Sequence, residues 1–432
     1  MKVIKYPTPD QWDDLLKRPE IESENLFAQV QTILNEVKSR GDDALYEFNL
    51  KFDKIKLDSL LVKEEELQEA NTLVSSALKE AIKVAYQNIY KFHSSQQVEE
   101  KKVETMAGVT CWRKAIPIEK VGLYIPGGTA PLFSTVLMLA IPAKIAGCKE
   151  VVLCTPPNTS GKIAPAILYA AQVAGVNKIY KVGGAQAIGA MAYGTESIPK
   201  VYKIFGPGNQ YVTAAKQLVS LKNVAIDMPA GPSEVAVLAD ESANPIFVAA
   251  DLLSQAEHGI DSQVLLVTTH EALIQEVEEE IDKQLKNLPR RELTEKTLLN
   301  SKIILVQSIE EGMSMINSYA PEHLIVEVKN YHEVSKLVVN AGSVFLGSYT
   351  PESAGDYASG TNHTLPTNGH ARAYSGVSLD SFVRKTTFQE ITQEGLQKLG
   401  PTIEVLAQNE LLDAHKNAVT LRLKTLQKEE VK

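Results

Sequence analysis

The sequence predicts an α/β protein with two doubly wound units in tandem. From residue 121 onward, short apolar runs alternate with helical patterns, as in EVVLCT at 150–155 followed by IAPAILYAAQVAGV at 163–176. A second series of such alternations begins at Glu234 with EVAVLAD. Alternation of strand and helix is typical of parallel βαβ units. The two series therefore predict two parallel sheets, each covered by helices.

The other elements follow from hydrophobic periodicity and local composition. Residues 24–39 place apolar side chains on one helical stripe, and residues 63–92 form a longer helical region. Residues 349–376 are rich in Gly, Ser, Thr, Asn and Pro. A loop of this length in a compact enzyme is usually functional. The chain is helical again over residues 389–426.

The predicted domain organisation has four parts, because the middle α/β unit is inserted into the other one. The parts are an N-terminal arm at 1–22, a main α/β domain made of 23–123 with 233–376, an inserted α/β domain at 124–232, and a helical C-terminal tail at 377–432.

Composition excludes several classes of function. The net charge of −9 argues against nucleic acid or an anionic membrane as the main partner. Three cysteines are too few for a disulfide framework and suggest a reducing compartment. The sequence lacks the roughly 18 consecutive apolar residues of a membrane helix, and its start lacks a signal-peptide pattern. We therefore expect a cytoplasmic protein.

Candidate metal ligands are spread along the chain. Gln255 and His258 lie three residues apart, so a helix would present an amide oxygen and an imidazole on one face. Together with Asp356 and His415 they form a set of nitrogen and oxygen donors that suits zinc, manganese or iron. The spacing matches no standard metal motif, so a hydrogen-bonded surface pair is the alternative interpretation of Gln255 and His258.

A carboxylate and an imidazole are adjacent at Glu322 and His323, within APEHLI. These two groups suit proton transfer at neutral pH, although such pairs also occur in proteins that make no use of them. Two further histidines also lie near an acidic residue in the sequence. His363 follows Asp356 in the long polar segment, and Glu410 precedes the tail histidine by five residues.

Three glycine-containing turns, YIPGG, KVGGAQ and FGPGN, follow predicted strands of the middle unit. Turns at one edge of a parallel sheet are where open α/β folds bind ligands. After FGPGN, Asp227 lies at the end of the next strand, where a dinucleotide fold carries its ribose-binding acid. Pro207 and Tyr211 interrupt the glycine fingerprint, so a tight turn between strand and helix is the alternative.

Several long segments of the chain together resemble histidinol dehydrogenase, in order from about residue 20 to 420. The segments that carry the resemblance are YIPGGTAPLFSTVLMLAIPAKIAGC, VGGAQAI, FGPGN, DMPAGPSE, DLLSQAEHG, APEHL and SAGDYASGTNHTLPT. The resemblance implies a fold of two incomplete Rossmann-like units with small terminal segments. It also implies a homodimer that binds one Zn²⁺ per subunit and NAD, the latter in the inserted domain, with active sites shared between subunits through the swapped tail.

The resemblance further implies a four-electron oxidation of L-histidinol through L-histidinal to L-histidine, the last steps of histidine biosynthesis. Its implied roles fall on twelve residues. The zinc ligands, which also contact substrate, are Gln255, His258 and Asp356 of one subunit with His415 of the partner subunit. The acid–base pair is Glu322 and His323, which also contact substrate, and further substrate contacts are Ser233, His363 and Glu410. The NAD contacts are Tyr124, Gln186 and Asn209.

In the expected mechanism His323 takes the hydroxyl proton, and Glu322 deprotonates the water that attacks the aldehyde. No thioester is needed, so Cys111, Cys148 and Cys154 stay outside the chemistry. Three alternatives remain at this point. An aldehyde dehydrogenase or acyl-phosphate reductase would need a nucleophilic cysteine in an exposed turn. A metallohydrolase with Glu322 as base would leave the glycine turns unexplained. A zinc-held protein that senses an imidazole ligand would bind histidinol tightly without turning over NAD.

Overall fold

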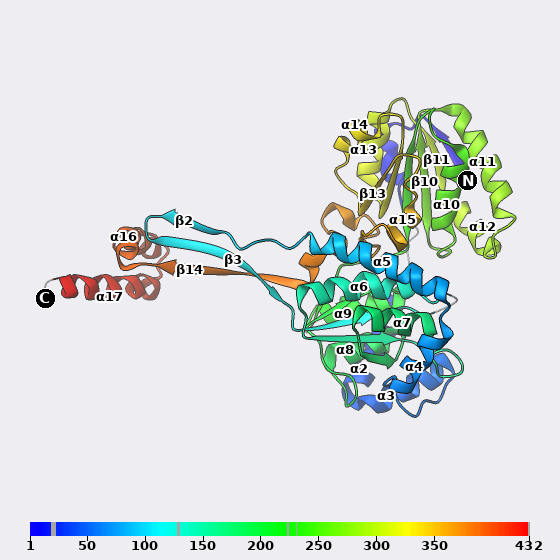
Figure 1. The fold of residues 1–432 in the computed structure, drawn as a ribbon. Helices are drawn as coiled ribbons and strands as arrows, with labels where there is room; N and C mark the ends of the chain where they lie inside the picture. Colours follow the sequence, from blue (N-terminus) through cyan, green and yellow to red (C-terminus); the bar gives the residue numbers. More distant parts are fainter. Residues whose placement is uncertain (19–22, 128–129, 223, 230, 431–432) are drawn as a thin grey trace. The chain divides into compact units, whose positions relative to one another are not determined.

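The computed structural model describes residues 1–18, 23–127, 130–222, 224–229 and 231–430. The chain divides into two compact units, Met1–Gln96 with Ile118–Phe382 and Gln97–Pro117 with Val383–Lys432. Within the described residues the strands form three sheets, of which two are parallel and belong to the first unit. The prediction of an α/β fold with two parallel sheets and a helical C-terminal segment is confirmed (Figure 1).

The five-stranded sheet has the order β6-β5-β4-β7-β8. Its strands are β4 (Lys120–Tyr124), β5 (Glu150–Thr155), β6 (Lys178–Lys181), β7 (Lys203–Phe205) and β8 (Ala225–Ile226). The helices between these strands are α6 (Phe133–Ala146), α7 (Pro165–Ala174), α8 (Gly184–Tyr193) and α9 (Gln210–Ser220). The chain builds outward from β4 in both directions, so the connections diverge between β4 and β7. A crevice at such a switch point is the usual ligand site of this class of sheet.

The six-stranded sheet has the order β1-β11-β10-β9-β12-β13. Its strands are β1 (Lys2–Lys5), β9 (Glu234–Ala239), β10 (Gln263–Thr268), β11 (Lys302–Leu305), β12 (His323–Glu327) and β13 (Ser343–Leu346). Its helices are α10 (Pro245–Ala256), α11 (Glu271–Leu285), α12 (Arg291–Leu299), α13 (Ile309–Tyr319), α14 (Tyr331–Val334) and α15 (Glu352–Tyr357), while the short α1 (Trp12–Leu15) follows β1. The predicted N-terminal arm thus begins as an edge strand paired with β11.

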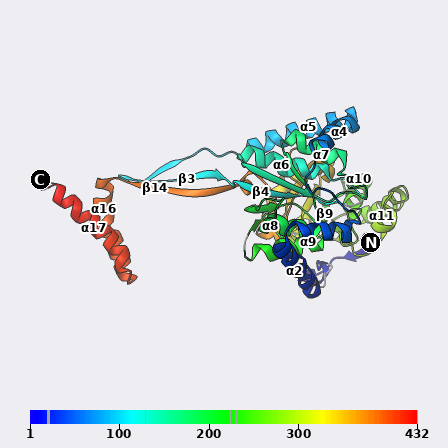
Figure 2. The same ribbon diagram turned by 90° about the horizontal axis from the view of Figure 1, so that it is seen from below.

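The N-terminal helices differ from the predicted domain grouping, which placed residues 23–123 with 233–376. They are α2 (Ser23–Arg40), α3 (Asp42–Phe48), a π-helical turn at Asn49–Asp53, α4 (Glu64–Leu73) and α5 (Ser76–Ser94). Instead, α2 packs on α8 and α9, while α4 packs on α7 and α5 on α6 (Figure 2). The apolar stripe of α2 is the reason, because Val30 and Leu34 are fully buried in the core of the five-stranded sheet.

Two helical predictions need correction. The helical region expected at 63–92 is broken, because Val74 is extended and the Ser75 side chain caps α5 by accepting from the Leu78 backbone N–H. The segment expected as a loop at 349–376 contains the helix α15. This short helix begins with the buried Glu352, whose side chain lies close to those of His258 and Asp356.

The second unit is an antiparallel sheet of order β14-β3-β2 with two helices. Its elements are β2 (Lys102–Met106), β3 (Val109–Pro117), β14 (Val383–Ile391), α16 (Gln393–Asn409) and α17 (Asp413–Glu430). The predicted tail at 377–432 is therefore helical only after β14, and it pairs with residues that were assigned to another domain. Sequence periodicity missed these strands because β2 and β14 are mostly exposed and β3 is mostly half-buried, so no alternation of buried apolar residues marks them.

Candidate functional site

Gln255 and His258 lie at the end of α10, but they do not share a helical face as predicted. The helix ends at Ala256, so His258 lies in the turn that follows, where its backbone N–H donates to the Gln255 carbonyl. Gln255 is buried, and His258 is exposed at the rim of the site. Both side chains nevertheless reach Glu352, because the turn after α10 keeps the two residues about one helical turn apart.

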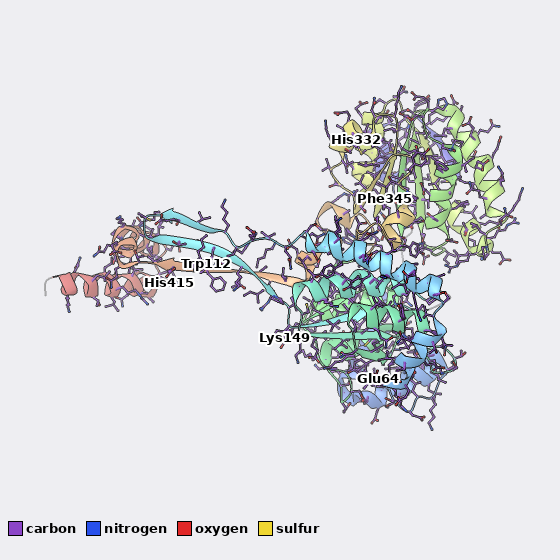
Figure 3. All side chains as sticks on the ribbon, viewed as in Figure 1. Glu64, Trp112, Lys149, His332, Phe345 and His415 are labelled. Carbon is purple, nitrogen blue, oxygen red and sulfur yellow. The ribbon has the colours of Figure 1, made fainter. Side chains whose placement is uncertain are left out.

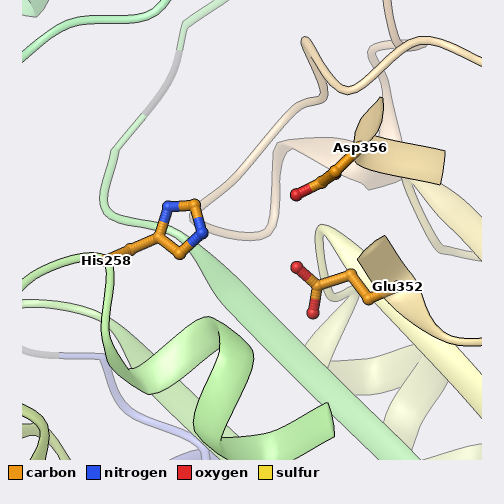
Figure 4. A group of neighbouring side chains, drawn as sticks. All are labelled: His258, Glu352 and Asp356. Atoms are coloured by element: carbon orange, nitrogen blue, oxygen red, sulfur yellow. The ribbon is translucent and has the colours of Figure 1, made fainter. Parts of the chain in front are cut away.

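His258, Glu352 and Asp356 converge, with one ligand atom of each lying within 4.8 Å of the others (Figure 4). Sequence reasoning found His258 and Asp356 but missed Glu352. A signal was available, since Glu352 and Asp356 are four residues apart and share one face of α15. A single zinc ion with bonds of about 2.0–2.2 Å would hold tetrahedral ligand atoms about 3.5 Å apart, so a side-chain shift of about an ångström would bring these atoms to one ion.

The Gln255 amide contacts Glu352 in either of its two orientations. In one, Nε2 donates to Glu352 Oε1 at 2.6 Å and Oε1 accepts from the Glu234 backbone N–H at 3.0 Å. In the other, Nε2 lies 3.4 Å from both Glu322 Oε2 and His323 Nδ1, and the amide oxygen faces Glu352. The first orientation pairs both amide groups, whereas the second leaves two oxygens facing each other, which requires a proton or a cation between them.

Glu322 and His323 lie at the start of β12 and are both buried. The Glu322 side chain accepts from the Glu234 backbone N–H at 2.9 Å, and His323 Nδ1 donates to the Glu234 carbonyl at 3.1 Å. His323 Nε2 has no hydrogen-bond partner in the described part of the chain and lies 3.6 Å from Asp356 Oδ1. The ring is therefore fixed through one nitrogen while the other faces the cluster.

Burial and charge shift the pKa values of these groups. Burial raises the pKa of Glu322 to about 8. Burial opposes the charge on His323, but the carboxylates of Glu322, Glu352 and Asp356 outweigh it and raise the pKa of His323. Loss of hydration lowers the pKa of His258, although part of its ring faces solvent. A neutral imidazole among carboxylates is the form that binds a metal ion.

Among the expected substrate contacts, Ser233 and His258 line one cavity of 1070 Å³. The imidazole of His363 lies deeper. Its Nδ1 donates to the Asp356 carbonyl at 2.8 Å, and its Nε2 lies 3.1 Å from Thr135 Oγ1. Both ring nitrogens are thus engaged within the protein, so in this structure His363 positions the Asp356 backbone.

The three glycine-containing turns line one cavity of 1130 Å³ at the carboxyl ends of β4, β6 and β7, as their positions on one sheet predict. All three expected cofactor contacts, Tyr124, Gln186 and Asn209, line it. The Tyr124 hydroxyl accepts from the Gly184 backbone N–H at 3.0 Å, at the start of α8. Asn209 and Tyr211 also line the cavity that contains His258, so the two cavities are neighbours.

Asp227 is not available as a ribose-binding acid. It forms a buried ion pair with Lys216 and accepts from the backbone N–H groups of Gly206 and Met228. The FGPGN segment is the tight turn that was the alternative interpretation. Gly206 has φ +126°, and a side-chain Cβ there would lie 2.1 Å from the Tyr124 carbonyl. Only glycine allows this close approach of the β7 and β4 ends.

Glu410 and His415 belong to the second unit, where both are exposed. Glu410 directly follows the last residue of α16. His415 lies in the first turn of α17 (Figure 3). The cluster of His258, Glu352 and Asp356 belongs to the first unit. The expected fourth ligand, His415, therefore belongs to a different unit from the cluster.

Cys148 and Cys154 lack the properties of a catalytic thiolate, and Cys111 lies on β3 and lines neither cavity. All three are free, and burial raises the pKa of Cys148 to about 12 and raises that of Cys154 as well. Nucleophilic cysteines have lowered pKa values instead. The aldehyde-dehydrogenase alternative lacks its essential group here.

A buried acid–base cluster beside one cavity, with a second cavity adjoining it at the switch point of a parallel sheet, is typical of an α/β enzyme. A family model described as histidinol dehydrogenase matches residues 16–423. The chain belongs to the histidinol dehydrogenase family, which is a family of oxidoreductases. No helix in the described part of the chain is long and apolar enough to cross a membrane.

Relatives match over nearly the whole length. The histidinol dehydrogenase of Bacteroides thetaiotaomicron is 69% identical over 426 residues, which are 99% of this chain and 100% of that protein. The chloroplastic histidinol dehydrogenase of Arabidopsis thaliana is 56% identical, over 96% of this chain and 90% of that protein. The crystal structure of histidinol dehydrogenase from Elizabethkingia anophelis superposes with a TM-score of 0.97, at 55% identity, over 99% of both chains.

Proposed function

We propose that the protein oxidises L-histidinol through L-histidinal to L-histidine, the last steps of histidine biosynthesis, with NAD and one zinc ion per subunit. One observation carries this proposal within the family. His323 is buried with Nδ1 fixed by the Glu234 carbonyl and with Nε2 free of hydrogen bonds to described residues, facing the carboxylate cluster. Where a metal cation offsets the carboxylates that raise the pKa of His323, an imidazole held in this way can take a proton from a substrate placed at the cluster.

The residues present fit a zinc ion. Gln255, His258 and Asp356 would hold it with His415 from the second subunit, and they offer the nitrogen and oxygen donors that zinc accepts. Glu352 supports the fit, because its Oε2 is buried without a partner among the described residues while Oε1 meets the Gln255 amide. When bound, the metal supplies a positive anchor that orients the amino and imidazole groups of the substrate.

The protein residues would move the protons of both steps. In the alcohol step His323 Nε2 takes the hydroxyl proton while the hydride of the carbon leaves to the nicotinamide of NAD. In the aldehyde step Glu322 takes a proton from water, which adds to the carbonyl carbon. His323 then accepts the proton of the hydrate as the second hydride leaves. A Glu322 pKa of about 8, raised by burial, suits a base that works near neutral pH.

The site would be shared between two subunits. Support comes from the second unit itself, whose buried apolar side chains, among the described residues, are Val109 and Ala407. Val405, Leu406 and Leu411 are 60%, 60% and 87% exposed on α16 and just after it. A segment with so little core of its own gains stability by packing on another surface, and a second copy of the chain supplies one.

The proposal includes a cytoplasmic location. Its support is chemical, because the three cysteines are free and none has a disulfide partner in the described structure. Free thiols are typical of a reducing compartment.

The test of the proposed chemistry is product analysis with two variants. Purified protein with zinc, NAD and L-histidinol is expected to yield L-histidine. His323→Asn should lower kcat by roughly 10²–10⁴-fold, because a general base is lost. Glu322→Gln should slow the aldehyde step more than the alcohol step. The exposed His332→Asn on α14 is the matched control and should leave kcat unchanged. A folded His323→Asn variant with wild-type kcat would refute the assignment.

A further inference from the structure

The cavity at the glycine turns contains one carboxylate without a partner. Asp53 lies at the end of the π-helical turn that follows α3, and it lines the cavity together with Tyr124, Gln186 and Asn209. Its Oδ2 is buried and forms no hydrogen bond to any described residue. Burial alone raises the pKa of Asp53 to about 6, and no cation beside it lowers the value. The side chain as a whole is half-buried at the cavity wall, so a carboxylate without a donor of its own can accept hydrogen bonds from a ligand there.

The usual ribose-binding acid of a dinucleotide fold is engaged elsewhere. Asp227 lies where that acid is expected, but Lys216 and two backbone N–H groups satisfy it. Asp53 approaches the same sheet edge from the N-terminal helices, far from Asp227 in the sequence. Asp53 therefore provides a carboxylate at the cavity, whereas Asp227 is used in the ion pair with Lys216.

The neighbouring cavities indicate which end of a dinucleotide Asp53 meets. Asn209 and Tyr211 lie where the two cavities adjoin, and the second cavity contains Ser233 and His258. The nicotinamide ring must face that second cavity, because the substrate is oxidised there. The adenosine end then extends away from it, toward Asp53 and the exposed ring of Phe52.

Charge at the cavity also favours the ligand with fewer phosphates. The charged residues among the described lining are three carboxylates and two cations, Glu36, Glu47, Asp53, Arg40 and Lys51. Arg40 is already paired with both glutamates. The guanidinium is thus not free to bind a 2′-phosphate bidentately, which is its usual role in proteins that prefer NADP.

We propose that Asp53 binds the 2′- and 3′-hydroxyls of the adenosine ribose of NAD and discriminates against the 2′-phosphate of NADP. This inference rests on the proposed function, in which NAD is the hydride acceptor. The carboxylate accepts hydrogen bonds from both hydroxyls. A 2′-phosphate removes one donor and places a like charge against the half-buried carboxylate of Asp53, which is unfavourable in both respects.

The experiment is titration calorimetry of the zinc-loaded protein with NAD and NADP at pH 8. Asp53→Ala should weaken NAD binding by roughly 10- to 100-fold, as expected for loss of hydrogen bonds to a charged group. NADP binding should stay the same or tighten, so the preference for NAD falls at least tenfold. Asp53→Asn should change the preference in the same direction. The control Asp43→Asn alters an exposed carboxylate of α3 outside the cavity and should change neither affinity.

A modified ligand tests the contact without a substitution. NAD with a 2′-deoxy adenosine ribose should bind the wild-type protein more weakly, and Asp53→Ala should remove most of that difference, since the side chain and hydroxyl are one contact. The wild-type half of this comparison decides the matter even if a variant fails to fold. Equal wild-type affinities for NAD and its 2′-deoxy form, or unchanged preference in folded variants, would overturn the inference while leaving the proposed function intact. No NAD binding by the wild type would overturn both.

Discussion

Glu352 shows at the scale of single residues what a sequence can and cannot reveal. Its neighbour Asp356 was predicted as a metal ligand from its place in the long polar segment, whereas the role of Glu352 became clear only from its contact with Gln255 at the start of α15. Asp227 shows the opposite error, since its place in the sequence suited a ribose-binding acid but Lys216 occupies it. The role of each carboxylate depends on the side chain that it contacts. That partner can lie in a distant segment of the chain, and hydrophobic periodicity does not predict such contacts.

Removal of the Glu352 charge should weaken the metal site. Glu352→Gln keeps the shape of the side chain but takes a carboxylate from the Gln255 amide and from the cluster. Loss of a group that supports metal ligands typically reduces metal affinity by about 10–100-fold. Competition with a chromophoric zinc chelator measures this directly. Glu241→Gln, at an exposed turn after β9, is the control. Equal zinc affinity of Glu352→Gln and wild type would show that Glu352 plays no part in the site.

The cysteines should be dispensable for the chemistry. Cys111, Cys148 and Cys154 can each become Ser with kcat within about threefold of wild type, because the proposed proton transfers use a carboxylate and an imidazole. Steady-state rates of the three folded variants provide the check. A loss of several orders of magnitude in any one of them would require a covalent thioester step.

At the scale of elements, the strongly periodic segments were predicted well and the exposed ones were not. The apolar stripe of α2 and the buried strands of both parallel sheets follow directly from the sequence. The strands β2, β3 and β14 do not, because few of their side chains are buried. Their pairing is set by backbone register, in which Trp112 lies opposite Phe388 and the two rings stack.

The connection between β7 and β8 depends on a buried ion pair. Asp227→Ala should lower the free energy of unfolding by about 3–5 kcal/mol, since it leaves the buried Lys216 ammonium without its counter-charge. Urea denaturation measures the loss, and the exposed Lys222→Met is a control that should change it little. Replacement of both partners, as Lys216→Met with Asp227→Leu, should recover part of the stability. A single variant as stable as wild type would show that the pair is unimportant.

At the scale of the whole molecule, the proposed site needs two chains. The first unit carries Gln255, His258 and Asp356, and the second carries His415. The sequence resemblance suggested this sharing, and periodicity alone could not, because contacts between subunits leave no local pattern in a chain. The nearly coreless second unit, with exposed leucines around α16 and α17, is the physical feature that supports it.

Sharing of the site predicts complementation. His258→Ala and His415→Ala should each be inactive alone. A mixed dimer has one site with both substitutions and one with neither, so co-refolded or co-expressed variants should regain part of the activity. Differently tagged subunits allow the mixed dimers to be purified before assay. Verified mixed dimers without activity would mean that both histidines act within one chain.

The proposed four-electron oxidation is tested most directly by counting the NADH molecules formed from a limiting, known amount of L-histidinol, with zinc present and NAD in excess. Absorbance at the nicotinamide band gives the count. A base at His323 and a water-activating Glu322 in one site predict two NADH per histidinol, with L-histidine as the product. One NADH would mean that the aldehyde is released and that Glu322 activates no water. The absence of NADH would contradict the proposed oxidation altogether.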